Sequence, residues 1–110
     1  MSSSFRHYAT GAGAIAEVVT PGAACALIEV RLHLSAAGGA VELFEVRDNS
    51  GAGAVYDIVL RSWGMNLLAD VHWLPDRPIL YAAADTITFA YTNSNGRTWG
   101  LEVIWQLGSA

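Results

Sequence analysis

Apolar and polar residues alternate along most of this chain, a pattern typical of β-strands. The clearest case is "CALIEVRLHLS" at 25–35, in which Ile28, Val30, Leu32 and Leu34 alternate with Glu29, Arg31 and His33. Such a period of two places one face of a strand on the core and the other toward solvent. No segment of eleven or more residues keeps the apolar spacing of an amphipathic helix, so the pattern predicts an all-β fold.

Further strands are predicted at "VELFEVRD" (41–48), "AVYDIVLRSW" (54–63), "LLADVHWL" (67–74), "TITFAYT" (86–92) and "RTWGLEVIWQL" (97–107). Weaker patterns lie at 5–10 and 14–20. The mixed pattern at Leu43 and Phe44 favours a bulge or a strand buried on both faces. The last two strands read as a hairpin closed by "NSNG" at 93–96.

Eight or nine short strands separated by turns describe an antiparallel β-sandwich, with a jelly roll as the best single choice. An immunoglobulin-like sandwich is the alternative, but the Cys, Trp, Cys spacing that supports it is missing. A chain of 110 residues is long enough for one domain. We expect the sandwich to span 14–110 and residues 1–13 to form a flexible N-terminal arm.

Composition and charge exclude several classes of function. Charged residues make up 15% of the chain, against roughly 25% in typical soluble proteins, which predicts a surface covered by copies of itself. A net charge of -4, with six scattered arginines and no lysine, argues against a nucleic-acid partner. No apolar run approaches the ~18 residues of a membrane span. The N-terminus lacks the apolar stretch of a secretory signal, which indicates cytoplasmic synthesis.

Candidate chemistry is sparse. Asp70 and His72 in "DVHW" share one face of a strand, a spacing that suits a metal or an acid-base pair. A third ligand is missing, so we interpret both as outward polar residues. The lone Cys25, flanked by alanines, is interpreted as a small buried hydrophobe. We therefore expect no catalytic residue, no metal, no cofactor and no enzymatic activity.

The four tryptophans are more informative. Trp99 and Trp105 alternate in phase with Leu101, Val103 and Leu107, which predicts that they pack in the core or at its rim. Trp73 reads as core in the same way. Trp63 shares a face with Asp57 and Arg61, so two interpretations stay open. Its ring either fills the core or is exposed, in which case it docks into a neighbouring subunit or stacks on a sugar.

The interface predicted from these arguments draws on two sets of residues. Leu27, Trp63 and Ile104 are read as outward apolar residues that subunit contacts cover. The arm contributes Phe5, Arg6 and Tyr8, which become ordered on a partner.

Several general features of the chain are typical of one known class of proteins. They are its short length, the absence of lysine, the enrichment in alanine and glycine, the arm "MSSSFRHYATGAG" and the terminal segment "DTITFAYTNSNGRTWGLEVIW". On these features the chain resembles the small all-β decoration or cement proteins of tailed bacteriophage capsids. The resemblance implies a trimer or another symmetric cluster bound to a major capsid protein, and it transfers no site residues.

Two functions follow as expectations. The first is a structural, oligomeric β-sandwich, with a trimer favoured, that binds and stabilises a larger assembly such as a phage capsid. Its location is the virion surface if the protein is encoded by a phage, and the cytoplasm otherwise. The alternative is a carbohydrate-binding module that uses an exposed tryptophan.

Overall fold

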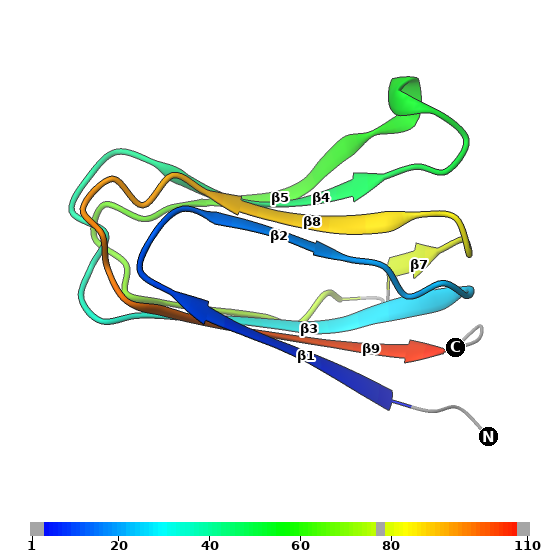
Figure 1. Cartoon of the computed structure of the whole chain (residues 1–110), viewed down its shortest axis with the longest axis horizontal. Helices are drawn as coiled ribbons and strands as arrows, with labels where there is room; N and C mark the ends of the chain where they lie inside the picture. The colour runs from blue at the N-terminus through cyan, green and yellow to red at the C-terminus, as the bar shows by residue number, and fades with distance from the viewer. Residues whose placement is uncertain (1–3, 77–78, 108–110) are drawn as a thin grey trace.

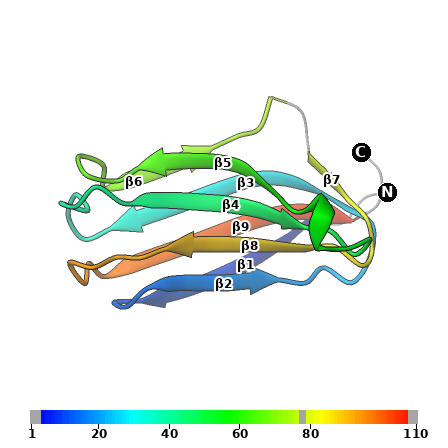
Figure 2. The ribbon, with the colours of Figure 1, turned by 90° about the horizontal axis from the view of Figure 1, so that it is seen from above.

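A computed structural model describes residues 4–76 and 79–107, which form two antiparallel sheets packed face to face (Figures 1 and 2). The elements are β1 (Ser4–Gly11), β2 (Ile15–Val19), β3 (Cys25–Leu34), β4 (Leu43–Asn49), the 3₁₀ helix η1 (Ala54–Tyr56), β5 (Ile58–Gly64), β6 (Asp70–Trp73), β7 (Ile79–Tyr81), β8 (Thr86–Tyr91) and β9 (Trp99–Leu107).

The five-stranded sheet has the order β1-β9-β3-β6, with β7 also paired to β3, and the four-stranded sheet has the order β2-β8-β4-β5. The prediction of an all-β sandwich of eight or nine strands is confirmed. The finer assignment as a jelly roll stays a prediction. The first four strands alternate between the two sheets, which agrees with it.

The prediction of a flexible arm is wrong for residues 4–11, which form β1. This strand pairs with β9 along its whole length, from Ser4 opposite Gln106 to Gly11 opposite Trp99. The ring of Phe5 stacks on Trp105 with centroids 6.0 Å apart. The backbone bonds to β9 hold this segment in place despite the glycines that follow it; residues 1–3 of the predicted arm lie outside the described residues.

The predicted hairpin of the last two strands is also wrong. β8 pairs with β2 and β4 in one sheet, whereas β9 pairs with β1 and β3 in the other. The turn at 93–96 therefore carries the chain from one sheet to the other, as Figure 1 shows. The apolar faces of the two strands pack toward each other across the core, which buries both of them.

A bulge in β3 explains the burial of Leu27, which was predicted to face outward. The register of β3 against β9 shifts between Leu27 and Glu29, so Ile28 is an extra residue. A bulge lets residues on either side of it point to the same face although their sequence spacing is odd. Leu27 and Val30 both point into the core and are fully buried, and the prediction for Leu27 is wrong.

Aromatic rings form a row that crosses the core. Phe89 stacks on Phe44, which stacks on Trp63, with centroids 6.4 and 5.6 Å apart, and Trp63 meets the edge of Trp73 at 5.6 Å. The row passes from β8 through β4 and β5 to β6, so it joins the two sheets on the side where β5 and β6 lie (Figure 2). Trp63 is thus half-buried within the row.

Trp99 is buried, and Trp105 and Trp73 are partly buried against the core. The prediction that these three rings pack in the core or at its rim is confirmed. Cys25, also buried, is confirmed as a small core residue.

Asn93 ties two connections together at one end of the sandwich. Its side chain is buried, and its amide nitrogen donates to the carbonyl oxygens of Gly13 and Arg97, both at 2.9 Å. Its oxygen accepts from the amide of Arg97 at 3.0 Å. The backbone of Asn93 has φ 53°, a left-handed conformation that asparagine adopts more readily than most residues.

We expect Asn93→Ala to lower the free energy of unfolding by about 3 kcal/mol, because it removes the hydrogen bonds of a buried side chain and puts alanine in a left-handed conformation. Asn93→Gly loses the same hydrogen bonds but fits the left-handed backbone. Its free energy of unfolding should therefore be about 1 kcal/mol higher than that of Asn93→Ala. Urea denaturation followed by tryptophan fluorescence measures both; equal stability of the two variants would contradict the backbone argument.

Candidate functional site

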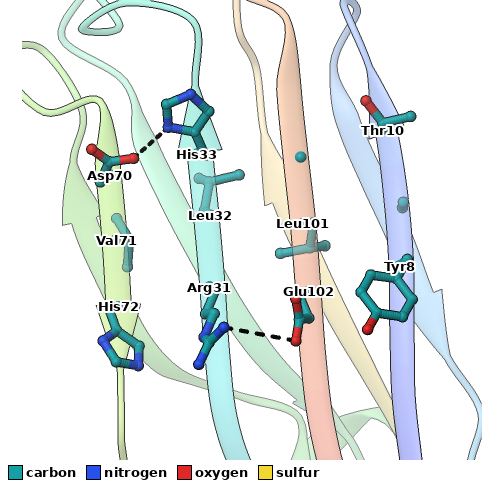
Figure 3. Close-up of a pocket in the computed structure, with 12 residues that line it drawn as sticks. Tyr8, Thr10, Arg31, Leu32, His33, Asp70, Val71, His72, Leu101 and Glu102 are labelled. Atoms are coloured by element: carbon teal, nitrogen blue, oxygen red, sulfur yellow. Dashed lines mark hydrogen bonds and ion pairs between the residues drawn. The ribbon is translucent and has the colours of Figure 1, made fainter.

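A hollow of about 750 Å³ lies on the outer face of the five-stranded sheet (Figure 3). Its side chains come from four adjacent strands, and the strand register arranges them in two rows. One row is Tyr8, Glu102, Arg31 and His72; the other is Thr10, Gly100, His33 and Asp70.

Ion pairs and hydrogen bonds connect the polar groups of this hollow. The Nδ1 of His33 lies 2.5 Å from Oδ1 of Asp70. Glu102 pairs with Arg6 at 2.6 Å and lies 3.9 Å from Arg31. Because these groups are held to one another, the side chains take defined positions around the hollow.

Glu29, beside the hollow, links the side chains of Arg31 and His72. Its Oε2 is 2.7 Å from Nε of Arg31 and 2.5 Å from Nε2 of His72. The hydrogen bond from Arg31, helped by a smaller contribution from His72, lowers the pKa of the Glu29 carboxyl. Glu29 is therefore a carboxylate that orients Arg31 and His72 from one side.

Gly100 forms the middle of the hollow, between Thr10 on β1 and His33 on β3 in the strand register. A Cβ built at this position meets no atom within 4 Å. The absence of a side chain at Gly100 leaves space between Thr10 and His33, which flank it in the strand register.

Asp70 and His72 are outward polar residues, as predicted, and both line the hollow. The partner of Asp70 is His33 and the partner of His72 is Glu29, both from β3. This convergence was missed, since the sequence shows only that these residues face outward and not which strand lies beside β6. Among the residues the structure describes, no group of three His, Cys, Asp or Glu side chains has the arrangement of a metal site.

A second surface lies where the β4–β5 connection rises away from the four-stranded sheet (Figure 1). Four of the five residues from 55 to 59 are large, apolar and exposed, and we call them the apolar tip. They are Val55, Tyr56, Ile58 and Val59, with exposed fractions of 85%, 62%, 56% and 41%.

The remaining predicted interface residues have mixed outcomes. Phe5, Arg6 and Tyr8 are exposed on β1, with Tyr8 at the hollow. Ile104 faces outward as predicted, but it is only 9% exposed because Arg6 and Glu29 flank it in the register. Little of Ile104 is left for a partner to cover.

No protein-family model, curated protein or solved structure matches this chain. In the described ranges, no helix is long and apolar enough to cross a membrane.

An acidic cluster closes the other end of the sandwich, near Tyr81. Asp57 accepts a hydrogen bond from the amide of Ser50, and Asp85 accepts from those of Gly51 and Ala82, at 2.8 to 2.9 Å. Both carboxylates thus hold turns.

Asp48 differs from these two, because its Oδ1 is buried without a hydrogen-bond partner among the described residues. Burial, followed by repulsion from Asp85 and Asp57, raises the pKa of Asp48 above its ordinary value of 3.8. The hydroxyl of Tyr81 is also buried and has no hydrogen-bond partner in the described part of the chain, and burial followed by the charge of Asp48 raises its pKa. Ionisation of Asp48 therefore lowers the free energy of unfolding.

We expect Asp48→Asn to raise the free energy of unfolding at pH 7, because it removes this ionised carboxylate. Because the pKa of Asp48 is higher in the folded state than in the unfolded state, the native protein becomes more stable as the pH falls through the folded-state pKa. Below the unfolded value near 3.8, Asp48 is protonated in both states and no longer destabilises the fold. The advantage of the variant should therefore shrink on acidification. Urea denaturation across pH 3.5–7 measures it, and Glu45→Gln on the outer face of β4 serves as a charge-matched control; an advantage independent of pH would contradict the argument.

Proposed function

We propose that this protein is a non-enzymatic structural protein that associates with copies of itself through the apolar tip and, as an oligomer, binds a larger assembly. The observation that carries the proposal is the exposure of four large apolar side chains within five consecutive residues. Large exposed apolar side chains gathered in one short segment mark interaction sites on otherwise soluble domains.

The apolar tip offers side chains rather than a strand edge. The register of β5 against β4 shifts between Val46 and Arg47, so an extra residue distorts β5 in its middle. Bulges of this kind protect edge strands from pairing with further strands. Beyond the bulge, the guanidinium of Arg61 lies 5.4 Å from the centre of the Trp63 ring. Contact through the tip thus depends on apolar burial.

A second copy of the chain is the partner that its composition favours. Asp57, the one charged residue between the members of the tip, accepts a hydrogen bond from the amide of Ser50. The low share of charged residues, 15%, indicates that surface beyond the tip is also covered. A trimer is the expected form, and the resemblance to decoration proteins makes a phage capsid lattice the first larger assembly to test.

The alternative of sugar stacking on Trp63 has less support. The ring of Trp63 is packed between Phe44 and Trp73, and Arg61 lies over it. Stacking on a sugar needs an open ring face, which this arrangement does not offer.

We expect the native protein to sediment as an oligomer at micromolar concentration and the double variant Tyr56→Ser, Ile58→Ser to sediment as a monomer. The substitutions remove exposed apolar surface without touching the core, so circular dichroism should be unchanged. Val41→Ser is the control. Val41 is 93% exposed, but it lies just before the start of β4, whereas the apolar tip follows the end of β4. A monomeric native protein, or an oligomer that persists in the double variant, would sink the proposal.

A further inference from the structure

We propose that the hollow on the outer face of the five-stranded sheet binds a neutral saccharide, with a sugar ring seated over Gly100. This site lies on the sheet opposite the one that carries the apolar tip, and it does not depend on self-association.

Gly100 has no structural reason to be glycine. Its pairing with Thr10 and His33 is regular on both sides, and its backbone is not among the glycines with positive φ. A Cβ at Gly100 meets nothing within 4 Å. By contrast, a Cβ at Gly11 would lie 3.1 Å from the ring of Trp99.

Glycine inside a strand weakens the strand, and it commonly marks a bulge, a bend or the close approach of a ligand. Regular pairing excludes a bulge at Gly100, and the open space above it excludes a contact with the described residues. What remains is the approach of something outside the chain, a ligand or another backbone, and the polar lining of the hollow favours a ligand.

The charge of the lining argues against an anionic ligand. Among the described residues, the lining holds the guanidinium of Arg31 and the two carboxylates of Asp70 and Glu102. Such a balance disfavours an anion, since binding one requires an excess of positive charge.

The polar groups of the lining suit vicinal hydroxyls, because planar side chains with both donors and acceptors stand around the hollow. Asp70 uses Oδ1 toward His33 and Arg31 uses Nε toward Glu29. A carboxylate accepts at about four lone-pair positions and a guanidinium has five N–H donors, so both retain capacity for a ligand.

Tyr8 supplies the apolar platform. Tyr8 is 66% exposed on β1, and its ring lies beside Glu102 at one side of the hollow (Figure 3). An exposed aromatic ring packs against the C–H face of a sugar. Three strand spacings of about 4.8 Å separate β1 from β6, so the hollow extends about 14 Å and has room for more than one ring.

The test is titration of the ¹⁵N-labelled protein with neutral cello-, manno-, galacto- and xylo-oligosaccharides, followed by NMR. We expect at least one series to shift the amides of Gly100, His33 and Arg31. Gly100→Val should weaken that binding by at least about tenfold while its unfolding midpoint is equal or higher, because a side chain fills the hollow and suits a strand better than glycine. Tyr8→Ala should weaken binding as well, with the fold retained.

Gly64→Val is the matched control, since Gly64 lies on β5 in the other sheet and a Cβ there also meets nothing within 4 Å. It should bind as the native protein does, and so should the Tyr56→Ser, Ile58→Ser variant. The proposal is overturned if none of the four series shifts these amides, if the shifts map to another surface, or if Gly100→Val binds like the native protein. Binding of sulfated oligosaccharides alone would also overturn it, because the ligand class is then anionic.

Discussion

The contact between Trp63 on β5 and Trp73 on β6 is the constraint on which much of this structure depends, because it joins the two sheets along one side. Phe44 and Phe89 continue the row into the centre of the core. Aromatic pairs with these offset and edge geometries add stabilisation beyond the apolar area that they bury. On the opposite side, where β1 and β2 are the edge strands, His7 and Glu17 meet at 2.9 Å.

The row also determines which surfaces are left for partners. Trp63 is committed to the core, so the ring that seemed best suited to a ligand in the sequence has little free surface. β5 is held beside the core by Leu60 and Trp63, while its first two residues and the 3₁₀ helix before it form the apolar tip. The hollow, in turn, lies outside the core on the other sheet, where Gly100 replaces a side chain in an otherwise full row of polar residues. The two proposed sites therefore occupy different faces, and one molecule has room for both partners at once.

Much of the strand content was predictable because a side-chain period of two is a local property. The faces of β8 and β9 are as predicted, with Ile87, Phe89, Trp99 and Leu101 all buried. The partners of these strands were not predictable, since backbone hydrogen bonds between strands carry no side-chain signature. Asn93 and Gly96 signalled a turn, and a turn between strands of opposite sheets uses the same residues as a hairpin. The same limit applies to the hollow, where Asp70 was noticed but its contact with His33, 37 residues away, was not.

The sequence by itself therefore determined that this protein is a β-sandwich and which face of most strands is buried, because alternation and turn residues act over a few positions. Only the tertiary structure decided that the weak strand pattern at 5–10 pairs with β9, that a bulge turns Leu27 inward, and that four strands bring Tyr8, Arg31, His33 and Asp70 around Gly100. These features depend on register, which is set by the sum of many contacts between residues far apart in the chain.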